Sequence, residues 1–224
     1  MSAAGPRLAL LDYGAGNLVS IEQALVAVGA QVGRATGPAD LRGVDVLVVP
    51  GVGAAAPAMA RLAESGLLEP VREWLAAGRP YLGICLGLQL LFEASDEDGA
   101  RTFGRLPGRV ERLAGVLRLP HIGWNSVERG GPHPLFAGIP PEACFYFVHS
   151  YAGLPPGGLE HPAVLGSTTH GGSFPSALVD EALVGVQFHP ERSGPDGLRL
   201  LANALAILGG STAFRPSPAT AGPA

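Results

Sequence analysis

The sequence predicts an α/β protein with a doubly wound, mostly parallel sheet and additional antiparallel strands. Three observations support this fold class. Short apolar runs alternate with helix-like stretches up to residue 92, which is the order of strands and helices in parallel sheets. The run at 44–49 is apolar on both faces, as in a strand buried between two layers of helices. Shorter strand-like runs separated by Gly and Pro follow, which favours antiparallel strands in the second half.

The first unit is predicted to be a strand at 8–11, a turn, a helix at about 18–28 and a strand at 31–34. The turn contains Gly14-Ala-Gly16, which invites a dinucleotide-binding interpretation. The third glycine of that motif would fall at Val19, and no acidic residue follows the next strand. An ordinary turn at the carboxyl end of a parallel strand is therefore favoured.

The central strands are predicted next. The strand at 44–49 runs directly into Pro50-Gly-Val-Gly53, and helices at 58–62 and 69–77 lead to a further strand at 81–84. The carboxyl ends of parallel strands lie at one edge of a sheet. We therefore expect the residues that follow each strand to line the functional crevice.

The pattern changes in the second half. Strand-like runs occur at 108–113, 116–119, 144–148, 163–169 and 177–179, and a buried strand at 183–188 precedes a closing helix at 197–208. We expect the shorter runs to wrap around the sheet as antiparallel strands. A single domain is predicted over 1–210, with a disordered tail over 211–224 that contains Pro216, Pro218, Gly222 and Pro223.

Composition excludes several classes of protein. The 224 residues are 47% hydrophobic and 15% charged, which is typical of one sizeable globular domain. The net charge of -4 gives no basic footprint for nucleic acid, and no apolar stretch is long enough for a signal peptide or a membrane span. Two cysteines, Cys85 and Cys144, are too few for a disulfide scaffold or a thiolate zinc site, which favours a reducing cytoplasm.

Residues 81–91, Tyr-Leu-Gly-Ile-Cys-Leu-Gly-Leu-Gln-Leu-Leu, predict a strand that turns sharply into a helix with Cys85 at the corner. Gly83 and Gly87 flank this corner, where the backbone folds back and neighbouring elements approach closely. Gly-x-Cys-x-Gly is thus the thiol counterpart of the Gly-x-Ser-x-Gly nucleophile elbow. A helix N-terminus would favour the thiolate form of the cysteine. A small buried cysteine beside packing glycines is the open alternative.

A cysteine nucleophile needs a base, and the base needs an orienting group. His189-Pro-Glu191 follows a buried strand and supplies both. If strand geometry persists, residues two apart face the same side, so one imidazole nitrogen would meet Cys85 and the other the carboxylate of Glu191. An acyl-transfer site also needs N–H donors for the oxyanion. The predicted donors are the backbone amides of Gly51, Val52, Gly53 and Leu86, although a plain loop after the strand remains possible.

The elbow, Gly83-Ile-Cys-Leu-Gly-Leu-Gln89, together with His189-Pro-Glu191, resembles the class I, triad glutamine amidotransferases, which release ammonia from the side-chain amide of glutamine. Further stretches resemble the glutaminase subunits of the imidazole glycerol phosphate synthases of histidine biosynthesis. These stretches are Asp12-Tyr-Gly-Ala-Gly-Asn-Leu18, Pro50-Gly-Val-Gly53, Pro120-His-Ile-Gly-Trp-Asn125, Phe145-Tyr-Phe-Val-His-Ser-Tyr151 and Gly185-Val-Gln-Phe-His-Pro-Glu-Arg-Ser-Gly194. The resemblance covers about residues 8–208 and implies a flavodoxin-like, three-layer architecture.

The resemblance implies a role for each matching residue. Cys85 would be the nucleophile, His189 the general base and acid, and Glu191 the group that orients His189. Gln89 and the backbone of Ser150 and Tyr151 would bind glutamine, and the oxyanion segment at 51–53 would rearrange before its amide points into the site. The residues expected to face a partner are Asn17, Pro120, His121, Trp124 and Arg192. That partner is a cyclase subunit, a (β/α)8 barrel that receives the ammonia in a heterodimer, and no cofactor or metal is implied.

Two departures from the family pattern stand out. Arg192 replaces the usual Lys after His-Pro-Glu, which keeps the charge but changes its geometry, and the segment at 101–108 differs from the usual start before Pro-Gly. Two alternatives stay open: a glutaminase that serves another acceptor, such as anthranilate, GMP or pyridoxal phosphate synthesis, and a non-catalytic regulatory subunit. The remaining candidates are His133, His161 and His170 as surface residues in loops, Cys144 as a core residue, and His149 as either structural or part of the glutamine pocket.

Overall fold

The computed structural model describes residues 5–115 and 118–209, and it confirms the predicted fold class. The main sheet has eight strands in the order β2-β1-β3-β4-β13-β12-β11-β8. Its parallel part consists of β2 (Gln31–Ala35), β1 (Arg7–Leu11), β3 (Val46–Val49), β4 (Tyr81–Ile84) and β13 (Leu183–Val186). With β13 as its fifth strand, this part has the 2-1-3-4-5 order of flavodoxin-like sheets.

The other strands extend or flank this sheet. Three antiparallel strands continue it, namely β12 (Gly172–Asp180), β11 (Val164–His170) and β8 (Glu128–Arg129). A three-stranded sheet contains β10 (Tyr151–Leu154), β6 (Arg109–Arg112) and β5 (Ala94–Ser95), and a two-stranded sheet contains β7 (His121–Ser126) and β9 (Cys144–His149). The prediction that the runs at 163–169 and 177–179 wrap around the sheet is therefore wrong, because these strands extend it.

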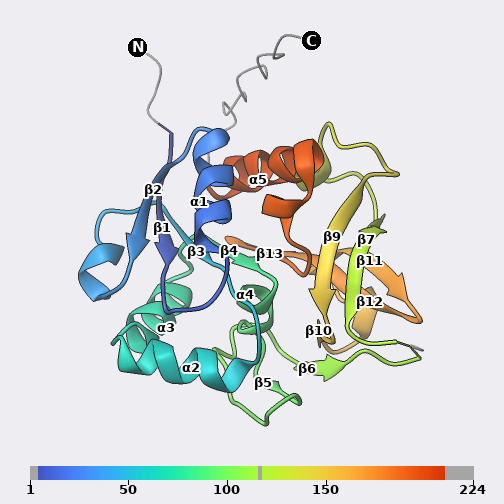
Figure 1. Ribbon diagram of the computed structural model, residues 1–224, viewed down its shortest axis with the longest axis horizontal. Helices are drawn as coiled ribbons and strands as arrows, with labels where there is room; N and C mark the ends of the chain where they lie inside the picture. The colour runs from blue at the N-terminus through green and yellow to red at the C-terminus, as the bar shows by residue number, and fades with distance from the viewer. Residues whose placement is uncertain (1–4, 116–117, 210–224) are drawn as a thin grey trace.

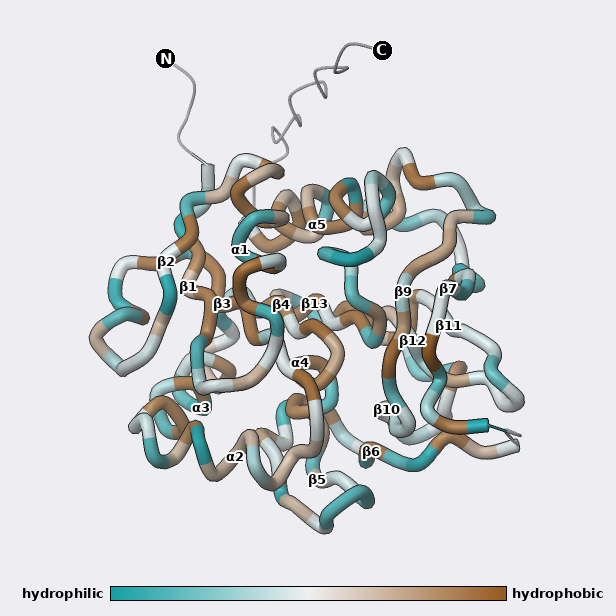
Figure 2. The backbone as a smooth tube through the Cα atoms, in the orientation of Figure 1, coloured by the Kyte–Doolittle hydropathy of each residue, from teal (hydrophilic) through white to brown (hydrophobic). Residues whose placement is uncertain are grey.

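Helices cover both faces of the sheet and make three layers (Figure 1). One face is covered by α1 (Leu18–Ala27) and α5 (Gly194–Leu208), the other by α2 (Ala55–Glu64) and α3 (Leu68–Ala76). The parallel strands feed both cores because side chains alternate along a strand: Leu8 and Leu10 of β1 lie in the α1–α5 core, whereas Ala9 and Leu11 lie in the other. Figure 2 shows these central strands as almost continuously hydrophobic.

Short helical turns occupy several connections. The structure has one turn of α-helix, α4 (Leu86–Gln89), and the 3-10 helices η1 (Pro38–Leu41), η2 (Pro134–Phe136), η3 (Gly158–Glu160) and η4 (Pro190–Arg192). The helix predicted after Cys85 is therefore confined to a single turn. No helix within 5–115 or 118–209 is both long and apolar enough to cross a lipid bilayer.

The structure corrects two further predictions. Residues 116–117 of the strand predicted at 116–119 lie outside the described residues, Arg118 and Leu119 form bends, and the strand begins at His121. Cys144 is exposed rather than part of the core, because it alternates with the buried Phe145 along β9. The tail predicted at 211–224 also lies outside the described residues.

Candidate active site

Four loops that follow parallel strands meet at one edge of the sheet, as open α/β sheets lead one to expect. Asn17 follows β1, the segment at 50–53 follows β3, Cys85 follows β4 and His189 follows β13. These loops border a small cavity lined by Gly16, Asn17, Ile21, Gly51, Val52, Ile84, Val148, His189, Glu191 and Arg192. The cavity collects residues from most of the loops that the sequence assigns to the active site.

Cys85 lies at a sharp corner, with a backbone φ of 54° and ψ of -108°. A positive φ is rare for a residue with a side chain and costs on the order of 1–3 kcal/mol, so the surrounding structure must hold it. The two flanking glycines allow this. A Cβ atom on Gly87 would lie 1.7 Å from the carbonyl oxygen of Val49, and one on Gly83 would lie 2.7 Å from that of Gly87. The corner thus depends on both glycines named from the sequence.

His189 and Glu191 form a buried pair. Nδ1 of His189 lies 2.8 Å from Oε1 of Glu191, whose side chain is 1% exposed. The reason given from the sequence is wrong, since the strand ends at Val186 and His189 begins the turn of η4. Ser193 fixes this turn because its Oγ donates to the His189 carbonyl at 2.6 Å. A short 3-10 turn, rather than strand alternation, brings the imidazole and the carboxylate together.

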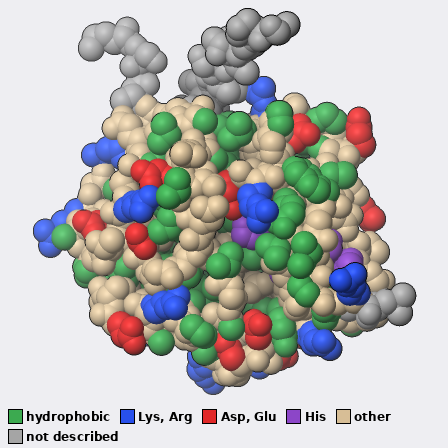
Figure 3. All heavy atoms as spheres, viewed as in Figure 1, with side chains coloured by type: hydrophobic (Ala, Val, Ile, Leu, Met, Phe, Trp, Pro, Cys, Tyr) green, Lys and Arg blue, Asp and Glu red, His purple; other side chains and the backbone are tan. Residues whose placement is uncertain are grey.

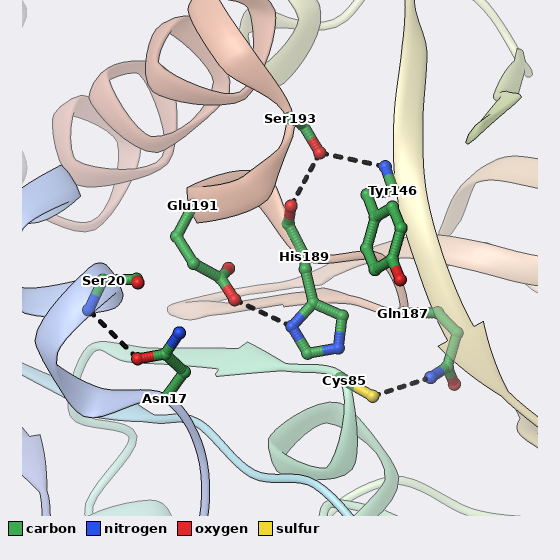
Figure 4. A network of polar contacts seen from close by, with 8 residues as sticks. All are labelled: Asn17, Ser20, Cys85, Tyr146, Gln187, His189, Glu191 and Ser193. Atoms are coloured by element: carbon green, nitrogen blue, oxygen red, sulfur yellow. Dashed lines mark hydrogen bonds and ion pairs between the residues drawn. The ribbon is translucent and has the colours of Figure 1, made fainter. Parts of the chain in front are cut away.

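The second imidazole nitrogen of His189 faces Cys85. Figure 4 shows the His189 ring between the Glu191 carboxylate and the Cys85 sulfur. Nε2 is buried and has no hydrogen-bond partner of ordinary geometry among the described residues. Burial by itself would lower the pKa of His189, but the thiol of Cys85 and the carboxylate of Glu191 outweigh it and raise that pKa to about 10. The site therefore favours an imidazolium beside the sulfur.

Gln187 is a residue of the site that was not identified from the sequence. Its Nε2 donates to Cys85 Sγ at 3.5 Å, and the residue is fully buried (Figure 4). The sequence did hold a signal, because a lone amide in the apolar run at 183–188 must find polar partners once it is buried. Gln187 places an N–H donor on the sulfur.

The predicted oxyanion donors are not assembled in this structure. The amide of Leu86 donates to the carbonyl oxygen of Gly51 at 3.4 Å, where a substrate oxyanion would otherwise accept. A Cβ atom on Gly51 would lie 2.4 Å from Tyr13 Oη, so the segment lies close against its neighbours. Val52 and Gly53 are exposed, and Gly53 has a φ of +89°. The segment at 51–53 is at the predicted place, with a carbonyl pointing where an amide was expected.

The residues predicted to bind glutamine lie beside Cys85. Gln89 is buried, and its Nε2 donates to the Tyr151 carbonyl at 2.8 Å and to Gln187 Oε1 at 3.0 Å. The carbonyl of Ser150 accepts from the Leu113 amide at 3.0 Å. Hydrogen bonds from Gln89 of α4 and from Leu113, the residue after β6, thus hold the Ser150–Tyr151 backbone at the start of β10.

The predicted partner residues differ in exposure. Trp124 is 58% exposed and its neighbour Ile122 is 60% exposed, and Figure 3 shows hydrophobic side chains gathered over the region of β7 and β9. Pro120 and Arg192 are also exposed, and the Arg192 guanidinium lies 3.9 Å from the centre of the Tyr146 ring. Asn17 is exposed and caps α1 by accepting from Ser20 N at 3.4 Å.

His121 does not belong to that surface. It is 4% exposed, since it lies on the face of β7 opposite to Ile122 and Trp124. Its ring stacks on Phe147, with centroids 4.8 Å apart, and on His170, with centroids 4.2 Å apart. The prediction that it contacts a partner directly is wrong.

The other histidines are divided between loops and this cluster. His133 and His161 are half-buried in loops, whereas His170 ends β11 and packs on His121, so its prediction as a loop residue is wrong. His149 is buried and contacts the backbone of Tyr151. Within the described ranges, no three His, Cys, Asp or Glu side chains are placed to hold a metal ion.

The sequence is similar to known proteins over most of its length. The family model for glutamine amidotransferase class-I matches residues 9–208. The chain is 50% identical over 200 residues to the imidazole glycerol phosphate synthase subunit HisH of Symbiobacterium thermophilum, covering 88% of this chain and 92% of that protein. It is 45% identical over 197 residues to the protein of the same name from Moorella thermoacetica, with the same two coverages.

Solved structures support the fold alone. A crystal structure of a glutamine amidotransferase superposes with a TM-score of 0.67 at 22% identity, covering 90% of this chain and 98% of that one. The structure of PurLQS from Thermotoga maritima gives a TM-score of 0.69 at 16% identity, with coverages of 91% and 99%. From the family match and the two relatives, the chain belongs to the class I glutamine amidotransferases and, within them, to the HisH subunits of imidazole glycerol phosphate synthase.

Proposed function

We propose that this chain hydrolyses glutamine to glutamate and ammonia and passes the ammonia to a cyclase subunit, which makes imidazole glycerol phosphate and AICAR in histidine biosynthesis. One observation carries the chemistry. The thiol of Cys85, held on a strained corner, faces an imidazole whose other nitrogen is 2.8 Å from a buried carboxylate. This is the arrangement of a nucleophile, a base and an orienting group.

The reaction proceeds through a thioester. The Cys85 thiolate attacks the δ-carbonyl carbon of glutamine, and the tetrahedral intermediate collapses with cleavage of the C–N bond. His189 gives its proton to the departing nitrogen, which leaves as ammonia. His189 then takes a proton from water as the water attacks the thioester, and glutamate and the free thiol are released. Glu191 keeps the imidazole oriented throughout, and no step calls for a cofactor.

The conformation of the segment at 51–53 explains why the reaction should be slow in the isolated chain. With the Gly51 carbonyl on the Leu86 amide, neither group can stabilise an oxyanion. If the peptide between Gly51 and Val52 turned over, the Leu86 amide would be free and the Val52 amide would point inward. An acceptor subunit that favours the turned form would therefore activate the enzyme, and glutamine would not be hydrolysed without a use for its ammonia.

The partner is proposed to be a (β/α)8-barrel cyclase subunit in a heterodimer. The relatives are named as subunits of a synthase, which supports a partner. Asn17 and Arg192 line the active-site cavity, and Arg192 and Trp124 both contact Tyr146. Trp124, Ile122 and Pro120 are exposed and provide apolar surface for a partner. A glutaminase for a different acceptor and a non-catalytic subunit are both less favoured, because the relatives carry the HisH name and all three predicted triad residues are present. The reducing cytoplasm stays a prediction.

The test is glutamate release from glutamine by the purified chain, alone and with the cyclase subunit plus its phosphoribosyl-ribulose substrate. We expect strong stimulation by the partner, and loss of all activity in Cys85→Ala. Full activity without the cyclase would contradict the proposed resting state of the segment at 51–53. A lack of glutamate release with the cyclase, while Cys85 still reacts with an electrophile, would assign the chain to a different acceptor.

A further inference from the structure

A group of side chains outside the catalytic pair forms one continuous series of hydrogen bonds. Nδ2 of Asn125 lies 3.3 Å from Nε2 of His121. Nδ1 of His121 lies 3.2 Å from Nε2 of His149. Nδ1 of His149 lies 2.8 Å from the carbonyl oxygen of Tyr151, which also accepts from Gln89 Nε2 at 2.8 Å. This relay, from Asn125 through His121 and His149 to the Tyr151 carbonyl, connects β7 with the side chain predicted to bind glutamine.

Backbone groups fix the direction of the relay at both ends. Asn125 accepts from the next backbone amide through Oδ1 and donates to the Thr169 carbonyl through Nδ2, each at 2.9 Å, so its amide has one orientation. Nε2 of His121 must then accept, and its Nδ1 carries the proton. At the other end the Tyr151 carbonyl can only accept, so Nδ1 of His149 donates and its Nε2 accepts. Both ends require the same arrangement, in which each imidazole is neutral.

The surroundings of the two rings favour that neutral state. Burial lowers the pKa of His149 to about 3 and the pKa of His121 to about 4. The other titratable groups whose charge acts on the pair are His170 and His189, and both disfavour a further positive charge on His149. Stacking of His121 between Phe147 and His170 holds its ring in plane for both hydrogen bonds.

The relay also determines what Gln89 can offer to a ligand. Its Nε2 has two hydrogens, and both are engaged, by the Tyr151 carbonyl and by Gln187 Oε1. Only the acceptor Oε1 is left for a substrate, and the ammonium group of an amino acid is a donor that suits it. Gln187 in turn donates to the sulfur of Cys85, so the orientation of one amide sets that of the next.

We propose that Asn125, His121 and His149 are positioning residues for the amino-acid substrate. Their relay holds the Tyr151 carbonyl, and through it the Gln89 amide, in the orientation that presents Oε1 to the substrate. The inference rests on the proposed glutaminase function and deepens it, since it names the group that fixes the polarity of the glutamine pocket. None of the three touches the reacting atoms, so they act on substrate affinity rather than on the chemical step.

The test compares two substitutions of His149. The Nδ2 of an asparagine takes nearly the place of the histidine Nδ1, so His149→Asn keeps the donor to Tyr151 but loses the ring. His149→Phe keeps an aromatic ring against Phe147 and Phe174 but has no donor. A residue that only packs would favour Phe, whereas the relay favours Asn. The ranking of the two variants therefore separates positioning from packing.

The readout is inactivation of the full chain by the diazoketone analogue of glutamine, followed as a mass shift on Cys85. The rate of inactivation, measured over a range of analogue concentrations, gives the half-saturating concentration and the maximal rate separately. We expect His149→Phe to raise the half-saturating concentration about 10-fold, because it removes one of the two side-chain donors to the Tyr151 carbonyl and leaves the buried Nδ1–H of His121 without an acceptor. The maximal rate should stay within about 3-fold of the parent. His149→Asn should bind the analogue within about 3-fold of the parent. Iodoacetamide, which needs no pocket, should label all variants equally.

Three results would decide against the relay or its premise. Tighter binding by His149→Phe than by His149→Asn, or no change in either, would refute the relay. If these variants do not fold, His121→Asn and His121→Phe repeat the comparison one link farther, because an asparagine there can still donate to His149. If iodoacetamide labels Cys85 of the parent chain but the diazoketone does not, the proposed glutaminase function is refuted, and the proposed role of the relay is refuted with it.

Discussion

Glu191→Gln tests the assignment of the buried carboxylate as the group that supports His189. The substitution keeps the size of the side chain, and the new amide oxygen can still accept from Nδ1 of His189, now 2.8 Å from Oε1. What it removes is the negative charge that stabilises the imidazolium. Two unit charges about 4 Å apart attract by about 4 kcal/mol at an effective dielectric constant of about 20, and the desolvation of the buried ions offsets part of this. A loss of about 3 kcal/mol corresponds to about a 150-fold lower kcat.

The buried position of the carboxylate adds to this effect. Oε2 of Glu191 has no hydrogen-bond partner among the described residues, so in Glu191→Gln the hydrogens of the new side-chain amide would be buried there without an acceptor. The pKa of His189, raised to about 10 by Cys85 and Glu191 against the opposing effect of burial, should fall. A folded-state pKa above the unfolded value stabilises the protein below about pH 6.5, and the stabilisation is lost as pH rises through about 10. Glu191→Gln should reduce this acid-side stability.

The assay is glutamate release by the complex with the cyclase subunit over a range of glutamine concentrations. We expect kcat to fall about 150-fold while KM stays within about 3-fold, because the carboxylate contacts the base rather than the glutamine pocket. Glu160→Gln, at an exposed position on η3, is the matched control and should leave both constants unchanged. A kcat within about 5-fold of the parent would show that His189 does not depend on this carboxylate.

Three further predictions concern stability and assembly. Gly87→Ala should destabilise the fold by more than about 3 kcal/mol in urea unfolding, because its Cβ would lie 1.7 Å from a carbonyl oxygen, whereas Gly37→Ala, with nothing within 4 Å, should be neutral. Burial lowers the pKa of His149 to about 3, so the free energy of unfolding should fall by about 2 kcal/mol between about pH 7 and about pH 5, because the unfolded chain binds the proton first. An equal pH dependence in His149→Phe would contradict this. Trp124→Ala should weaken cyclase binding by about 2 kcal/mol in calorimetry, and Leu159→Ala, at another exposed apolar position, should not.

Much of the fold could be predicted because its signals are local. The side chains of β3 alternate between the two cores, so the strand is apolar on both faces, and such a short uninterrupted apolar run is visible in the sequence. The strand β7 was missed for a related reason. Its inward side chain is the polar His121 and its outward ones are Ile122 and Trp124, which is the reverse of the usual pattern.

The candidate site divides in the same way. Cys85, with Gly83 and Gly87, is a motif of adjacent residues, and the clash of a Cβ atom on Gly87 with Val49 explains why the motif needs its glycines. The pairing of His189 with Glu191 was predicted from spacing, although a 3-10 turn rather than a strand achieves it. Gln187 was missed because nothing near it in sequence shows which buried groups it meets.

By itself the sequence determined the parallel sheet, the cysteine corner and the identity of the triad candidates, since each depends on residues a few positions apart. Only the tertiary structure decided that the Gly51 carbonyl accepts a hydrogen bond from the Leu86 amide and that His121 points inward. It also decided that the side chains around Cys85 are joined by hydrogen bonds. The contacts of Gln187 with Gln89 and Cys85 span 98 and 102 residues. The direction of a peptide or an amide is set by the partner it meets after folding, and partners so far apart in the chain leave no periodic signal in the sequence.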